Sequence, residues 1–254
     1  MQLGLVSVSF RDHSPQEIIN AVREAGLTCI EWGSDVHAPC TDKNCLKKIA
    51  AMQKTASITC CSYGTYFYLG RDNPEELHQY IWAAKYLGTN ILRLWCGTKG
   101  SKDYSAEELE VLYRDCRSAA KIAEENGVIL CMECHNGTVT DTKESAYRLM
   151  QTVNSPAFRM YWQPNQLRTP EENLAYAKLL APYTYHVHVF NWSIQENGSL
   201  LKHPLLDAVD IWKGYVKQLS GEHVMLLEFM PDNNILSLPC ESDALRAIMK
   251  RGDE

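Results

Sequence analysis

The sequence predicts a single (β/α)8 barrel, an α/β fold in which residues 1–254 form one domain. Apolar runs alternate with segments of helical period from one end of the chain to the other, which is typical of a parallel sheet covered by helices. There are eight such pairs, and 254 residues is close to the ~250 residues that parallel barrels commonly occupy as one domain. The composition, with 45% hydrophobic and 22% charged residues, is close to the average for globular proteins.

The eight predicted strands cover residues 3–10, 27–32, 57–63, 89–95, 128–133, 158–162, 184–190 and 223–228. The helices that follow them are predicted at about residues 14–26, 41–56, 73–87, 105–126, 141–153, 169–180, 204–219 and 239–250. The first helix has Ser14 as its cap and Glu17 at the third position, and Gly26 ends it. An open doubly wound sheet is the alternative, but no Gly-x-Gly-x-x-Gly motif follows the first strand. Residues 191–203, the longest irregular connection, are predicted to form a loop over the barrel mouth.

Charge and hydropathy argue against several classes of protein. The formal net charge is −6 and the pI is about 5.8, so the chain as a whole lacks the basic footprint of a nucleic-acid-binding protein. No basic region precedes an apolar stretch of signal-peptide length after Met1, so no signal peptide is expected, and no apolar run approaches the ~18 residues of a membrane span. We therefore expect a cytoplasmic protein without a nucleic-acid or membrane partner, in which the ten cysteines are reduced and mostly buried.

Polar residues interrupt three predicted strands at their C-terminal ends, where the active sites of such barrels lie. They are Glu133 in the fifth strand, His188 in the seventh and Glu228 in the eighth. A carboxylate buried among apolar side chains is costly unless it is paired, protonated or metal-bound, and two carboxylates at one mouth would repel each other. A divalent cation resolves both problems, and Gln163 at the end of the sixth strand is the natural fourth donor through its amide oxygen. This donor set suits Mn²⁺, Mg²⁺, Co²⁺ or Zn²⁺.

Side-chain alternation along a strand separates neighbouring candidates. His186 and His188 share a face and His188 lies nearer the mouth, so we expect His188 to be the ligand and His186 to be packed and hydrogen-bonded. Cys131 and Cys134 have the spacing of a zinc or redox motif. Residues three apart on a strand face opposite sides, so these two thiols are not expected to converge.

The polar residues at the strand ends resemble those of the xylose-isomerase-like barrel superfamily and, more narrowly, those of the sugar phosphate isomerase/epimerase family. The resemblance is carried by Glu133 followed by His135, by His188 and by Glu228, and it extends over nearly the whole chain. Three segments are similar to one bacterial branch of that family, namely residues 31–37, 161–164 and 187–192.

The resemblance implies which residues hold the metal and which move protons. By strand position, the family's ligands map to Glu133, Gln163, His188 and Glu228. Gln163 stands where the family usually has aspartate, and Gln166 stands where many members have histidine. A neutral amide leaves the site one charge more positive, which weakens the expected metal binding. The resemblance also implies that Glu133 and Glu228 act as acid and base on opposite faces of a substrate carbon.

A small carbohydrate is the substrate that the resemblance implies. The candidates for binding its hydroxyl groups and ring faces are Glu31, His37, Arg93, Trp95, His135 and Trp192. Trp95 and Trp192 have the alternative of packing in the core or in a lid, and Arg93 has the alternative of neutralising an internal carboxylate. The sequence leaves open whether the chain forms a homo-oligomer.

Three functions are compatible with these residues. The first is a metal-dependent isomerase or epimerase that moves a proton α to a carbonyl through an enediolate, with Glu133 and Glu228 as the acid/base pair. The second is a lyase or dehydratase that acts on a keto-sugar or cyclitol by the same carbanion chemistry. The third, suggested by Gln163 and Gln166, is a sugar-binding relative without catalysis. The acidic balance disfavours the DNA-repair branch of the superfamily, endonuclease IV.

Overall fold

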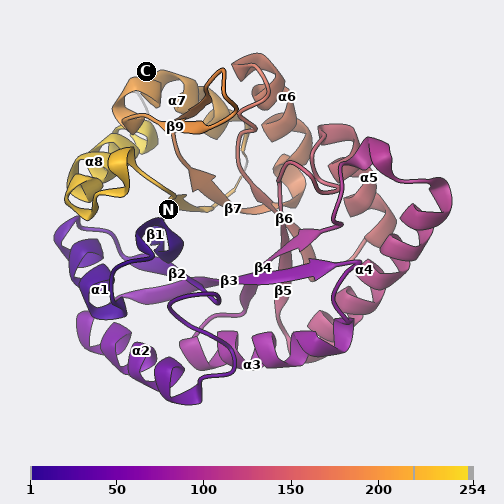
Figure 1. Cartoon of the computed structure of the whole chain (residues 1–254), viewed down its shortest axis with the longest axis horizontal. Helices are drawn as coiled ribbons and strands as arrows, with labels where there is room; N and C mark the ends of the chain where they lie inside the picture. The colour runs from indigo at the N-terminus through magenta and orange to yellow at the C-terminus, as the bar shows by residue number, and fades with distance from the viewer. Residues whose placement is uncertain (1, 220, 251–254) are drawn as a thin grey trace.

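The computed structural model describes residues 2–219 and 221–250, and it is a closed barrel of eight parallel strands surrounded by helices (Figure 1). The barrel strands are β1 (Leu3–Val6), β2 (Cys29–Gly33), β3 (Thr59–Leu69), β4 (Ile91–Cys96), β5 (Ile129–Glu133), β6 (Phe158–Trp162), β7 (Thr184–Val189) and β10 (Val224–Leu227). The α-helices are α1 (Pro15–Glu24), α2 (Lys43–Ala56), α3 (Leu77–Leu87), α4 (Ala106–Asn126), α5 (Lys143–Val153), α6 (Pro170–Leu180), α7 (Val209–Gln218) and α8 (Leu238–Met249). The predicted (β/α)8 barrel is confirmed.

The first and last strands close the barrel. Strand β1 pairs in parallel with both β2 and β10, and every other strand of the barrel pairs with its sequence neighbours. Three helices begin with a capping box. The side chains of Ser14, Ser105 and Thr169 each accept a hydrogen bond from the third backbone N–H of their helix, and the backbone N–H of each cap residue donates to the glutamate at that third position. Each cap satisfies two backbone donors that a helix start leaves unpaired.

Two apolar layers hold the barrel together. The larger lies between strands and helices and includes Trp32 and Trp162, which are both fully buried. The smaller includes Val6, Cys131 and Leu226. Cys131 and Cys134 therefore belong to different layers, as alternation along β5 predicts, and all ten cysteines are free.

Two predicted strands differ in extent from the observed ones. The strand predicted at residues 3–10 ends at Val6, and the chain continues as a 3₁₀ turn (Ser7–Phe10) that buries Ser7 and Ser9. The strand predicted at residues 57–63 runs on to Leu69, because the aromatic residues that follow residue 63 favour an extended backbone.

Residues 191–203 lie over the barrel mouth as predicted, since Trp192, Ile194 and Leu200 line the cavity there, but the prediction that this connection is irregular is wrong. This segment contains an antiparallel hairpin of β8 (Trp192–Ile194) and β9 (Leu200–Lys202). Gly198 turns the chain with a φ of 80°, and its N–H donates to the Gln195 carbonyl at 2.9 Å. Among the described helices, none combines the length and the apolar character needed to cross a membrane.

Candidate active site and metal centre

The C-terminal ends of the strands surround a cavity of about 270 Å³. Glu133 is the last residue of β5, Gln163 follows β6 and Glu228 follows β10, and all three line this cavity. Trp95, at the end of β4, forms part of its wall. The strand ends that carry polar residues in the sequence are thus brought to one place.

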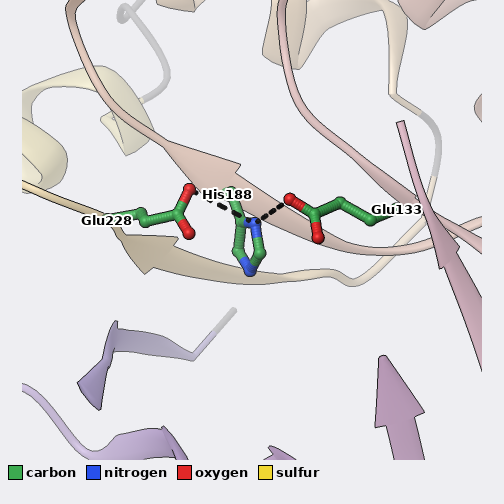
Figure 2. A group of neighbouring side chains, drawn as sticks. All are labelled: Glu133, His188 and Glu228. Carbon is green, nitrogen blue, oxygen red and sulfur yellow. Dashed lines mark ion pairs between the residues drawn. The ribbon is translucent and has the colours of Figure 1, made fainter. Parts of the chain in front are cut away.

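Three side-chain oxygen atoms surround one imidazole nitrogen. His188 Nδ1 lies 3.7 Å from Glu133 Oε1, 3.5 Å from Glu228 Oε2 and 2.9 Å from Gln163 Oε1. Figure 2 shows the two carboxylates approaching this nitrogen from opposite sides. Ligand atoms of the three ionisable residues all lie within 4.8 Å of one another, and all three residues are buried. Two carboxylates, an imidazole and an amide oxygen fit a hard or borderline divalent cation.

The pKa values of the two glutamates in this cluster are shifted in opposite directions. Burial disfavours the charged form of Glu133, but Arg93 and His188 outweigh it and lower the pKa of this carboxyl to about 2. Burial raises the pKa of Glu228, and His188 offsets this only in part. Burial also disfavours the imidazolium form of His188, but Glu228 and Glu31 outweigh it and raise the pKa of the ring to about 10. The site therefore stabilises the charged form of Glu133 more than that of Glu228.

Glu31 lies behind the metal-ligand candidates and does not line the cavity. It accepts hydrogen bonds from Ser62 Oγ at 2.6 Å and from Arg93 Nε at 3.0 Å, and it is fully buried. His188 Nε2 lies 3.6 Å from Glu31 Oε1, so the carboxylate faces the ring nitrogen that points away from Glu133. Burial opposes ionisation of Glu31, but Arg93 and His188 outweigh it and lower its pKa. A carboxylate in this position orients a ligating imidazole.

Arg93 reaches the cavity and also neutralises internal carboxylates. Its Nη1 donates to Glu133 Oε2 at 2.7 Å, while its Nε donates to Glu31. Two anions around one buried guanidinium compensate for the loss of water around all three groups. The guanidinium thus holds Glu133 in its charged form and fixes the position of its second oxygen.

The ring nitrogens of two other histidines form hydrogen bonds within the protein. His37 Nδ1 lies 3.1 Å from Ser7 Oγ and its Nε2 lies 3.1 Å from the His13 carbonyl oxygen, and the side chain does not line the cavity. His186 contacts the carbonyl oxygens of Tyr185 and Cys61, so it is packed and hydrogen-bonded as predicted.

Aromatic side chains form much of the cavity wall. The ring centroids of Trp95 and His135 are 5.6 Å apart, and those of Tyr66 and Trp95 are 5.1 Å apart. Trp192 lies against Phe229, with centroids 5.4 Å apart. Two residues of the wall were not predicted from the sequence. Tyr66 was missed because the third strand was predicted to end before it, and Phe229 was missed because only its place directly after Glu228 indicates a role. The aromatic walls can contact the face of a ring in a bound molecule, and the polar residues of the floor can bind its oxygen atoms.

The chain is similar in sequence and in fold to a dehydratase. The chain is 28% identical over 174 residues to a 3-dehydroshikimate dehydratase of Bacillus anthracis, and the match covers 63% of this chain and 60% of that protein's length. The crystal structure of the probable 3-DHS dehydratase of Bacillus anthracis has a TM-score of 0.81 at 20% identity, covering 97% of this chain and 99% of the other.

Other solved structures share the same architecture. A xylose isomerase-like TIM barrel protein of Mycobacterium smegmatis, in complex with magnesium, has a TM-score of 0.72 at 14% identity over 98% of this chain and 95% of that one. An L-ribulose 3-epimerase has a TM-score of 0.71 at 13% identity over 98% and 94% of the two chains. The model of the xylose isomerase-like TIM barrel family matches residues 19–230, so the chain belongs to that family.

Proposed function

We propose that this chain is a metal-dependent sugar isomerase or epimerase that moves a proton α to a carbonyl through an enediolate. The observation that carries the proposal is the placement of Glu133 and Glu228 on opposite sides of His188 at the floor of one cavity (Figure 2). Two carboxyl groups that face each other across a reacting carbon can remove a proton from one face and return it to the other.

A divalent metal ion is part of the proposal. Glu133, Gln163, His188 and Glu228 would hold it, and the close approach of their donor atoms fits this role. The donor set would suit Mn²⁺, Mg²⁺, Co²⁺ or Zn²⁺, and the ion would supply Lewis-acid polarisation of a substrate oxygen. The magnesium complex of a protein with the same fold supports a divalent ion.

The protein's own groups have distinct roles in this proposal. In this assignment Glu133 acts as the base, because Arg93 lowers its pKa and keeps it charged, and Glu228 acts as the acid, because burial raises its pKa. Glu31 positions the His188 ring from behind. Trp95, together with His135 and Trp192, binds ring faces and hydroxyl groups in the cavity. Acid–base transfer of this kind contributes roughly 10²–10⁴-fold to a rate.

A dehydratase is the second candidate, and the similarity to a 3-dehydroshikimate dehydratase favours it. The same base would remove the α-proton, and a β-hydroxyl would then take a proton from His135 Nε2 and leave as water. His135 is available for this step, because it lines the cavity and its Nδ1 lies 2.6 Å from the Asn136 carbonyl oxygen, which leaves Nε2 to the substrate.

The test follows solvent protons and product mass in one experiment. Metal-loaded protein is incubated in D₂O with ketoses and with 3-dehydroshikimate, and the products are analysed by NMR and mass spectrometry. An isomerase or epimerase incorporates deuterium at the reacting carbon and otherwise conserves the mass of the substrate, whereas a dehydratase product has lost water.

Two variants test whether Glu133 and Glu228 are the acid/base pair. We expect Glu133→Gln and Glu228→Gln each to lower the exchange rate by roughly 10²-fold or more. Glu241→Gln is the matched control, because Glu241 is a buried glutamate on α8 that does not line the cavity, and it is expected to retain the rate. Exchange at the wild-type rate in both site variants would reject the acid/base assignment.

A further inference from the structure

One face of the β8–β9 hairpin carries a lysine to the mouth of the cavity. In the hairpin, Trp192 lies directly opposite Lys202, and Ile194 lies directly opposite Leu200. Side chains that are two residues apart on a strand, or directly opposite on paired strands, share a face. All of these residues except Lys202 line the cavity, so Lys202 lies on the cavity side of the hairpin, at the rim.

The ammonium group of Lys202 lies over an aromatic ring of the cavity wall. Its nitrogen is 4.7 Å from the centroid of the Phe229 ring, and that centroid is 5.4 Å from the ring of Trp192. Phe229 has a φ of 48°, which is unfavourable for a residue with a Cβ, and its N–H donates to Ser9 Oγ at 2.9 Å. Such a backbone persists only where the surrounding structure holds it, so the ring under the ammonium group is fixed in place.

The ammonium group of Lys202 keeps donors free for a ligand. It has three N–H donors, of which one goes to the side-chain oxygen of Asn233, and no carboxylate of the described residues forms an ion pair with it. Burial lowers the pKa of Lys202, and the charge of Glu228 opposes this, so the lysine and the reacting groups of the cavity act on each other. A partly buried cation without a carboxylate partner favours an anionic ligand.

Two arginines near the same cavity are already paired. Arg93 donates to two buried carboxylates, and Arg11, which lies beside the Tyr66 ring, pairs with Asp35. A guanidinium whose charge is compensated by a carboxylate has little of it left for a ligand. Of these three cations, Lys202 is the one that can offer its charge to a substrate anion.

We propose that Lys202 is a specificity-determining residue that binds an anionic group of the substrate, a carboxylate or a phosphate. The reacting carbon would lie over Glu133 and Glu228, and the anionic end would lie at the rim, under the hairpin. This inference rests on the proposed function, because it takes the cavity to be the place where a carbohydrate reacts. It narrows the substrate class to sugars or sugar-like molecules with a charged end.

Isothermal titration calorimetry on the Mn²⁺-loaded protein tests this role of Lys202. The probes are D-fructose, D-fructuronate and D-fructose 6-phosphate, which carry a neutral hydroxymethyl group, a carboxylate and a phosphate at the same carbon of one keto-sugar. We expect at least one of the two anionic probes to bind about tenfold or more tightly than D-fructose. A gain for D-fructuronate alone identifies a carboxylate as the group that is bound, and a gain for the phosphate alone identifies a phosphate.

A matched pair of variants locates that gain. Lys202→Met removes the charge and keeps an unbranched apolar side chain over Phe229. Lys99→Met is the control, because the Lys99 nitrogen also lies 4.7 Å from the centroid of an aromatic ring, that of Tyr104, and Lys99 follows β4 at the same end of the barrel without lining the cavity. We expect the anionic probes to bind Lys202→Met no more tightly than D-fructose does, whereas Lys99→Met keeps the tenfold gain.

The outcomes separate this inference from the proposed function. If D-fructose binds and neither anionic probe binds more tightly, or if the gain survives in Lys202→Met, the role of Lys202 is overturned and the proposed function stands. The same holds if both variants lose the gain, because the loss would then not be specific to the charge at the rim. If the metal-loaded protein binds none of the three sugars, both the role of Lys202 and the proposed function are overturned.

Discussion

Gln163 sets the charge of the candidate metal centre. Its Oε1 lies 2.9 Å from His188 Nδ1, in the position where the family resemblance implies a carboxylate. With Glu133 and Glu228 as the only anionic donors of the set, an amide leaves the loaded site neutral where aspartate would leave it anionic. We predict that Gln163→Asp tightens Mn²⁺ binding by about tenfold or more, because affinity for hard cations rises with the number of charged ligands. Calorimetric titration with Mn²⁺ measures it.

The control for Gln163→Asp is Gln166→Asp, which adds the same charge three residues further along a loop that lines the same cavity. Its gain in Mn²⁺ affinity should be much smaller than that of Gln163→Asp, since a charge near the site is screened whereas a ligand bond is not. Equal gains in the two variants would show that the added charge alone accounts for the tighter binding and that residue 163 does not ligate the metal.

Individual site residues were predictable where one rule decides their position. Glu133, His188 and Glu228 each interrupt an apolar strand at its C-terminal end, and strand ends of this kind converge in any parallel barrel. Glu31 obeys the same rule, yet it lies behind His188 and bonds to Arg93. The depth of a side chain in the barrel depends on the stagger between strands, which alternation along one strand does not reveal.

At the scale of elements, the hairpin of β8 and β9 covers one side of the cavity. Ile194 and Leu200 form one of its cross-strand pairs, and both line the cavity. The turn depends on Gly198, whose φ of 80° is unfavourable for any residue with a Cβ, although nothing lies within 4 Å of the place that a Cβ would occupy. A substitution there consequently acts on the backbone alone.

We predict that Gly198→Ala destabilises the hairpin by about 1 kcal/mol and leaves the barrel intact. Hydrogen–deuterium exchange should accelerate in residues 192–203 and stay unchanged elsewhere, with the Tm shifted by less than about 2–4 °C. Gly214→Ala is the control, because Gly214 lies within α7 and the added Cβ would have an ordinary contact at 3.5 Å with Leu174. Unchanged exchange across the hairpin in Gly198→Ala would contradict this role of the turn.

Most elements were predictable because period and caps agree. The long helix over residues 105–126 begins at the Ser105 cap and ends before Gly127, and the structure has it at Ala106–Asn126. The hairpin escaped prediction because its strands are three residues long and lie in a polar segment, where alternation is too short to register. The extension of β3 to Leu69 was missed for a different reason. Gly64 follows the predicted end of the strand, and glycine within a strand pattern favours a bulge or an end; the pairing with β4 does shift register between Gly64 and Tyr68.

At the scale of the whole molecule, a buried ionic network joins strands that are distant in sequence. Ion pairs join Arg93 on β4 to Glu31 on β2 and to Glu133 on β5. His188 on β7 lies close to Glu31 and to Glu228, which follows β10, at the floor of the cavity. Its members stabilise the barrel only while their charges compensate, because each would be costly if it were left unpaired. The stability of the fold is therefore linked to protons and to the metal at the same site.

This linkage predicts how the stability of the metal-free protein depends on pH. The pKa of His188 is about 10 in the folded chain, against an ordinary value of 6.5 for the unfolded chain, so folding favours the protonated ring. A group of this kind contributes its full stability below pH 6.5 and loses it as the pH rises toward 10. The slope is at most about 1.4 kcal/mol per pH unit for one proton. The Tm of the metal-free protein should accordingly fall between those two pH values.

Adding Mn²⁺ should remove much of this fall, because a metal ion needs the neutral imidazole and takes the place of the proton. Differential scanning calorimetry from pH 6 to pH 10, with EDTA-treated and Mn²⁺-loaded protein, measures both curves. Other groups titrate near pH 10, so His188→Gln provides the reference: its metal-free Tm should fall less steeply than that of the wild type, and Mn²⁺ should change it little. A wild-type curve that matches the variant with and without Mn²⁺ would mean that proton and metal do not share His188.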